Sequence, residues 1–116
     1  MHKLVKAIKA LSNEARLRIL NLLLERECCV CEVMQALDIS ESRASRNLSA
    51  LYDAGFLKLR KDGLWSFYSI DRDRTDDFYS QLVDAARIAL EGNKVAKADR
   101  ARLRKVERVG PAAVRK

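Results

Sequence analysis

The sequence predicts a mostly helical domain that carries one small β-hairpin. Two observations predict this class. First, apolar residues recur at helical spacing before residue 54 and again over 74–91. Second, apolar and polar residues alternate, as in a strand, only between residues 56 and 70. The chain has 116 residues, which is enough for one hydrophobic core but not for two. We therefore expect one domain over 1–92, followed by a basic tail over 93–116.

Four helices are expected before the hairpin. They cover residues 3–11, 14–25, 31–37 and 40–54. Ser12-Asn13 supplies a cap before the second helix, and Ser40 is placed to cap the fourth. Gly55 suits the left-handed position that follows a helix end, so the fourth helix is expected to stop at Ala54.

The hairpin and the last helix follow Gly55. Residues 56–60 alternate between apolar and polar, Asp62-Gly63 is a strong turn signal, and 65–70 read as the return strand. An amphipathic helix is expected over 74–91, and Gly92-Asn93 stops it. Helix can resume in the tail as far as Arg108, because no Gly or Pro interrupts that stretch.

The net charge of +7 comes entirely from the tail. Residues 1–92 hold 14 basic and 14 acidic side chains, whereas residues 93–116 hold nine basic and two acidic ones. A basic tail attracts polyanions, of which nucleic acid is the commonest inside cells. A solvated helix end is the alternative interpretation.

All three cysteines lie within four residues, at Cys28, Cys29 and Cys31. The chain shows no signal-peptide block and no membrane-length apolar run, so we expect a cytoplasmic protein with reduced thiols. Thiolates bind soft ions, and a helix N-terminus favours the thiolate. No regular backbone brings all three sulfurs together, because Cys28 and Cys31 share a helix face whereas Cys29 and Cys31 share a strand face. Binding one ion with three sulfurs must then distort the first turn of helix 31–37.

An enzyme is not expected. Catalysis by a cysteine needs a nearby general base, and the only histidine is His2 at the chain start. No phosphate-binding loop appears among the four glycines.

The order of elements is that of a helix-turn-helix followed by a wing. The residues that fill it resemble the ArsR/SmtB-type metal-sensing repressors. The stretches that carry the resemblance are 11–20, 27–33, 39–48, 53–57 and 62–68. The resemblance covers residues 4–71 and implies a winged helix-turn-helix homodimer, in which the first and the long C-terminal helices form the interface. It implies a transcriptional repressor whose two 40–54 helices bind palindromic, double-stranded operator DNA. Apolar residues that would lack other partners fit such an interface: Leu4, Ile8, Phe78, Leu82 and Ala86.

The resemblance places DNA contacts on helix 40–54 and on the wing. Candidates on the helix are Ser42, Arg43, Ser45, Arg46 and Asn47. Arg can pair with guanine and Asn with adenine, although a solvated helix face is the alternative for both arginines. Arg60 and Lys61 are candidates for phosphate contacts from the wing. The family usually has His at position 47 and often a basic residue at position 64, where this chain has Asn and Leu.

The cysteines match the Cys-Val-Cys motif of the arsenite-sensing branch. The resemblance implies that Cys29 and Cys31 bind arsenite or antimonite and that binding releases the operator. Met34 stands where that branch often has a third cysteine, so we expect Cys28 to replace it as a ligand, with core packing as its alternative. A thiol redox sensor and a cadmium or lead sensor, to which His2 could add a nitrogen ligand, are the alternative functions. The family's other metal site needs histidines on the last helix, and this chain has none there.

Overall fold

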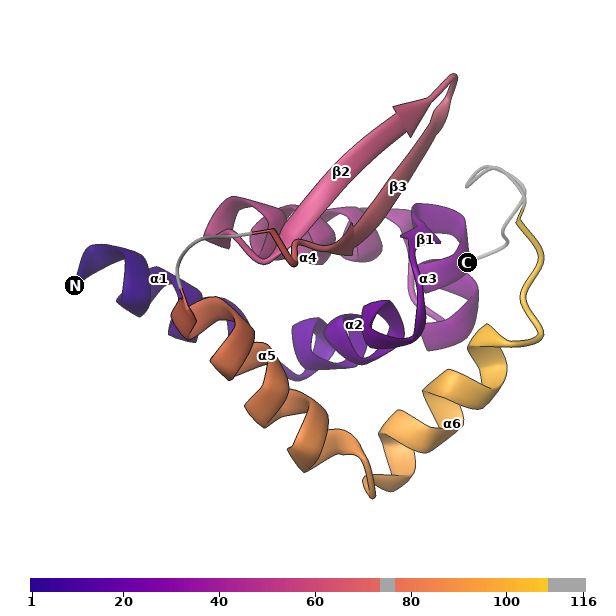
Figure 1. Cartoon of the computed structure of the whole chain (residues 1–116). Helices are drawn as coiled ribbons and strands as arrows, with labels where there is room; N and C mark the ends of the chain where they lie inside the picture. The colour runs from indigo at the N-terminus through magenta and orange to yellow at the C-terminus, as the bar shows by residue number, and fades with distance from the viewer. Residues whose placement is uncertain (74–76, 109–116) are drawn as a thin grey trace.

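The computed structural model describes residues 1–73 and 77–108 (Figure 1). Its elements in chain order are α1 (His2–Leu11), α2 (Glu14–Glu25), β1 (Cys28–Cys29), α3 (Val30–Leu37), α4 (Glu41–Ala54), β2 (Leu57–Asp62), β3 (Trp65–Ile70), α5 (Asp77–Leu90) and α6 (Lys94–Leu103). The expected mostly helical class with a small antiparallel sheet is confirmed.

Helix α2 lies at the centre of the molecule. It contacts α1, α3, α4, α5 and α6, and Figure 1 shows it between α5 and α6. Ile19, Leu20 and Leu22 are fully buried, since other elements pack around the helix. Asn13 begins the helix, as expected, by accepting a hydrogen bond from the Arg16 amide at 3.0 Å.

Helices α3 and α4 form the helix-turn-helix, and both ends of α4 are closed as expected. The Ser40 hydroxyl accepts a hydrogen bond from the Arg43 amide at 3.2 Å. Gly55 takes the left-handed conformation, with φ of +103°. The Tyr79 hydroxyl donates to the Ala54 carbonyl at 2.8 Å, and a Cβ on Gly55 would lie 2.6 Å from that hydroxyl. Backbone and space therefore both require glycine at position 55.

The sheet has three strands in the order β1-β3-β2. The β2–β3 hairpin is the expected wing, and it projects away from the helices in Figure 1. Strand β1 was not expected, since we placed the cysteine cluster at a helix start. Cys28 pairs with Tyr68 and Cys29 with Phe67, and α3 begins at Val30. Two residues are too short to show strand alternation, so only the partner strand reveals this one.

Helix α6 accounts for part of the expected basic tail. Asn93 accepts a hydrogen bond from the Ala96 amide at 3.0 Å, and α6 packs against α2 and α3. Asp99 is fully buried and pairs with Arg18 at 2.8 Å. Residues 94–103 are therefore packed onto the domain. Residues 74–76 of the expected long helix and 109–116 of the tail lie outside the described residues.

The surface expected to form the dimer interface is exposed on α1 but largely packed against the core on α5. Leu4 and Ile8 of α1 are 39% and 47% exposed. Phe78, Leu82 and Ala86 of α5 are half-buried and pack against the core, so the expectation that they lack partners within the chain is wrong. Over the described residues, every helix is too short or too polar to cross a bilayer.

Candidate functional site

The polar face of α4, which we define as Ser42, Arg43, Ser45, Arg46 and Asn47, lies largely in solvent. Ser42, Arg43 and Arg46 are exposed, and Ser45 and Asn47 are half-buried. Neither arginine makes an ion pair with a described residue. Ala44, Leu48 and Leu51 on the opposite side are buried in the core, so the helix can present only its polar face.

Asn47 differs from its neighbours because its amide is already bonded. Its Nδ2 donates to the Arg43 carbonyl at 2.9 Å, and its Oδ1 accepts from Arg16 Nη1 at 3.4 Å. Arg16 also donates to the carbonyls of Lys9 and Ala10 at the end of α1. Asn47 therefore connects α4 to the end of α1, a link that no spacing in the sequence indicates.

The two wing candidates have different surroundings. The Arg60 guanidinium lies 4.4 Å from the Phe67 ring centroid, and its Nη2 is 2.8 Å from Glu27 Oε1. Lys61 is exposed and has no ion pair within the described part of the chain. Leu64 is fully exposed at the hairpin turn. Lys61 thus differs from Lys58 and Arg60, which are also exposed on β2 but each pair with a carboxylate.

Cys29 and Cys31 form a pair, which we call the dithiol site. Their sulfurs are joined in a disulfide, with the Cα atoms 5.5 Å apart. They meet because Cys29 is an extended residue that caps α3 and Cys31 lies in its first turn, so neither the strand rule nor the helix rule applies across them. Their exposed fractions are only 2% and 0%. We expected reduced thiols here, and the structure instead holds the oxidised pair.

Cys28 does not join the pair. It is fully buried in the main core with residues of α2 and α3, whereas Cys29 and Cys31 form a separate cluster with Phe67. Successive residues of a strand point to opposite faces, and this separates the two sulfur positions. Burial raises the pKa of the Cys28 thiol to about 12. Across residues 1–73 and 77–108, no three ligand-type side chains gather to hold a metal ion, so the expected sulfur trio is not preformed.

One buried carboxylate next to the dithiol site pairs with two arginines. The Glu32 carboxylate is buried, and it accepts a hydrogen bond from the Cys29 amide at 2.9 Å. It also pairs with Arg26 at 2.9 Å and with Arg108 at 3.3 Å. Burial opposes ionisation of Glu32, but the hydrogen bond from Arg26, supported by Cys29 and Arg108, holds its pKa below the ordinary value. Sequence spacing gave no sign of Arg108, which is 76 residues from Glu32.

The dithiol site also adjoins the wing and the helix-turn-helix. Cys29 pairs with Phe67 of β3 in the wing, and Cys31 lies in α3, which packs on α4. A shift of β1 or of the first turn of α3 would therefore reach close-packed neighbours in the wing and in α4.

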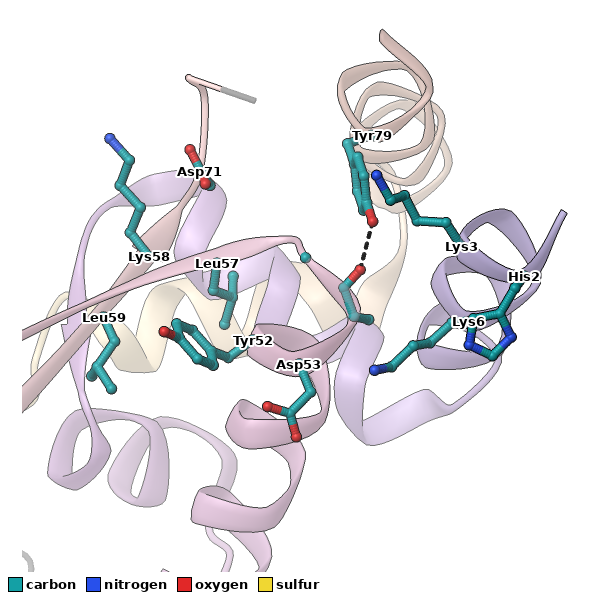
Figure 2. Close-up of a pocket in the computed structure, with 12 residues that line it drawn as sticks. His2, Lys3, Lys6, Tyr52, Asp53, Leu57, Lys58, Leu59, Asp71 and Tyr79 are labelled. Carbon is teal, nitrogen blue, oxygen red and sulfur yellow. Dashed lines mark hydrogen bonds between the residues drawn. The ribbon is translucent and has the colours of Figure 1, made fainter. Parts of the chain in front are cut away.

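A cavity of about 780 Å³ lies elsewhere, between α1, the end of α4 and the start of β2. Figure 2 shows Lys3 and Lys6 on one side, Tyr52 and Asp53 below, and Lys58 on the far side. Neither the cysteines nor the polar face of α4 lines it. His2, which the sequence analysis considered as an additional nitrogen ligand, does line this cavity and so lies apart from the cysteines.

Comparison with known proteins matches residues 13–64 to the family described as "Bacterial regulatory protein, arsR family". A cadmium resistance transcriptional regulatory protein CadC homolog of Staphylococcus aureus is 40% identical over 82 residues, covering 70% of this chain and 64% of that protein. A putative arsenical resistance operon repressor ArsR of Halobacterium salinarum is 37% identical over 92 residues, covering 78% and 64%. The chain thus spans a little under two thirds of the length of both relatives.

Solved structures agree with this match. HlyU from Vibrio cholerae superposes with a TM-score of 0.65 at 30% identity, over 76% of this chain and 91% of that one. The homodimeric winged helix-turn-helix DNA-binding domain Mb0332 of Mycobacterium bovis, a possible ArsR-family regulator, gives 0.65 at 27% identity, over 80% and 82%. Both similarities extend over most of the described fold.

Proposed function

Because the chain belongs to the arsR family of bacterial regulatory proteins, we propose that it is a transcriptional repressor whose hold on DNA is controlled at Cys29 and Cys31. The observation that carries this proposal is the position of the dithiol site. It adjoins both the wing strand β3 and the helix α3 that packs on α4. One small change at two sulfurs can thereby reach both elements that a winged helix-turn-helix uses on DNA.

The proposed DNA contacts divide between bases and phosphates. Arg43 and Arg46 are exposed and unpaired with any described carboxylate, so they can fork onto guanine edges, while Ser42 and Ser45 can bond bases or phosphates. Lys61, and Arg60 if it leaves Glu27, would contact phosphates from the wing. Asn47 is already bonded within the chain, and we assign it to holding α4 in place.

A homodimer is part of the proposal. Exposed apolar residues on α1 and α5, among them Leu4, Ile8 and Ile88, would be covered by a second copy. The related Mycobacterium bovis domain is homodimeric. Two α4 helices related by a twofold axis would then read a palindromic operator, one helical turn of DNA apart.

The proposed effector is a soft, thiophilic ion of the arsenite or antimonite class. Cys29 and Cys31 have their Cα atoms 5.5 Å apart, so once reduced they can both place a thiolate on one soft ion. Arsenical and cadmium resistance regulators among the relatives support a metalloid or metal effector. An ion seated between the sulfurs would push them apart and displace β1 or the start of α3. Cys28 can supply a third sulfur only if β1 leaves the sheet, because it lies in the main core.

The test measures DNA release by the reduced full chain. A fluorescent duplex is first selected from a random pool with this protein, and arsenite, antimonite and cadmium are then titrated against the complex. We expect arsenite to release the duplex, and no release by any of the three ions after Cys29→Ser with Cys31→Ser. The matched control is Cys28→Ala, which should still respond if two sulfurs suffice. Release that persists in the double variant would overturn the proposal. A promoter-fusion reporter gives the sign of regulation, since HlyU of Vibrio cholerae is named an activator.

The disulfide itself supports a second candidate, a thiol redox switch. Two thiols would lose two protons and two electrons to a peroxide, giving the Cys29–Cys31 disulfide and water. The same duplex distinguishes the two functions. A redox switch predicts that oxidised and reduced protein differ in DNA affinity with no arsenical present, whereas a pure ion sensor predicts equal affinities.

A further inference from the structure

The dithiol site is closed to solvent. Cys29 and Cys31 are almost fully buried, and with Phe67 they form a small cluster against which Trp65 packs. A buried sulfur becomes reachable only after a local opening of the surrounding structure. The element that opens then controls how an effector enters.

The residues that follow α6 lie against this site. The Arg108 guanidinium is 4.8 Å from the Phe67 ring centroid, and its Nη2 is 3.3 Å from Glu32 Oε1. Gln35 Nε2 donates to the Glu107 carbonyl at 2.7 Å, and the Glu107 amide donates to Gln35 Oε1 at 3.3 Å. Since Glu32 and Gln35 both belong to α3, this segment is fastened to the helix that Cys29 caps.

This segment is held to the domain by weaker contacts than α6 is. Helix α6 is tied to α2 by the buried Asp99, which pairs with Arg18, and to α3 by Arg102, which donates to the Ala36 carbonyl. Beyond α6, the bonds between Gln35 and Glu107 are exposed, and Arg108 is about half exposed. Exposed contacts of this kind contribute little each, so the segment can open while α6 stays in place.

We propose that Glu107 and Arg108 form a cover of the dithiol site, which regulates how fast effector ions and thiol reagents reach Cys29 and Cys31. The inference rests on the proposed function in one respect, that this dithiol is the effector site. The cover lies outside residues 13–64 that match the arsR family. Because binding couplings are reciprocal, an effector that needs the open cover also favours its release from α3.

The test measures thiol access and needs neither arsenic nor DNA. All proteins carry Cys28→Ala, so that only two thiols report, and they are fully reduced before an aromatic disulfide reagent is added. One thiolate attacks the reagent and releases a coloured aryl thiolate. The second thiol then displaces the other aryl group, which closes the Cys29–Cys31 disulfide. At high reagent concentration the rate reaches a plateau set by opening, and this plateau does not depend on the reactivity of the thiols.

We expect Arg108→Ala, which removes one half-exposed ion pair, to raise the plateau about threefold to fivefold. Gln35→Ala removes two exposed bonds to Glu107 and one to the Cys31 carbonyl, and it should raise the plateau at least as much. The matched control is Arg104→Ala, which removes an ion pair of the same 3.3 Å length, to Glu25, away from the cysteines. Its plateau should equal that of the background protein. The proposed cover would be overturned if all four proteins reached the same plateau. It would also be overturned if the thiols of the Cys28→Ala background protein reacted as fast as those of the Arg108→Ala variant. Failure of arsenite to release DNA would overturn the proposed function and leave these rates unchanged.

Discussion

On the polar face of α4, Arg43 and Arg46 stand in solvent without an ion pair to any described residue, whereas around the dithiol site each guanidinium is engaged. Arg26 and Arg108 pair with the buried Glu32, and Arg60 pairs with Glu27. The first region keeps its charges available to a partner molecule, and the second uses its charges to hold the chain together. Substitutions should therefore affect binding in the first region and stability or access in the second.

The largest effect is expected at Asp99, which is buried, pairs with Arg102 on its own helix, and ties α6 to the domain through Arg18 of α2. Asp99→Ala should lower the free energy of unfolding by about 2–3 kcal/mol. This is less than for a fully buried pair, because both arginines can turn toward water. Urea denaturation measures it, with Arg87→Ala as the control for an exposed ion pair to Asp84. If the polar face is independent of α6, folded Asp99→Ala should still bind the selected duplex as the wild type does. Weaker binding would break the division between the two regions.

The next effect concerns DNA binding. Arg46→Ala and Arg43→Ala should each weaken binding of the selected duplex by about 1–3 kcal/mol and relax its base preference, with unchanged thermal stability. Lys97→Ala, which removes an exposed charge from α6, is the matched control. Fluorescence anisotropy on the parent duplex and on single-base variants measures both quantities. A uniform loss over all duplexes would mean that the arginines bind phosphate and do not read bases.

A smaller effect is expected at Asn47. Since its amide is bonded to Arg43 and Arg16, Asn47→Ala should weaken DNA binding by no more than about 1 kcal/mol, equally for all single-base variants. Arg16→Lys should give a similar, non-additive loss, because the two side chains share one bond. If Asn47→Ala instead lost its base preference at a single base pair, Asn47 would be a residue that reads a base.

The smallest effect belongs to neither region and serves as a baseline. The hydrogen bond from Lys58 holds the pKa of Asp73 below its ordinary value. A depressed pKa contributes stability that is present above the unfolded pKa and is lost as the pH falls through the folded one. Wild type and Asp73→Asn should thus differ slightly in Tm above about pH 4 and converge in stronger acid. A gap that stays constant with pH would mean that the pair contributes through shape alone.

Local signals in the sequence predicted the helices and the hairpin well. Ser40 and Gly55 bound α4 as expected, since a cap and a left-handed residue act within a few residues of the helix end. The exposed arginines of α4 could also be found from spacing, because a helix that buries Ala44, Leu48 and Leu51 can present only its other side. These features depend on contacts close in sequence.

Long-range partners could not be predicted in the same way. Strand β1 exists because β3, about 40 residues later, pairs with it, and this pairing separates Cys28 from Cys29. The packing of α6 depends on Asp99 meeting Arg18, and the approach of Arg108 to Glu32 joins residues 76 apart. Charge counting placed Arg108 in a basic tail, since composition does not reveal which cations are already paired.

The hydrogen bond from the Tyr79 hydroxyl to the Ala54 carbonyl, beside Gly55, bears on the spacing between the two DNA half-sites that a dimer would bind. It ties α5 to the point where the α4 helix gives way to the wing, and glycine alone fits there. Helix α4 and the wing should consequently move together as one rigid unit. In a dimer, the spacing between the two half-sites would then depend on how the two subunits are oriented at their interface, and little on motion within either subunit.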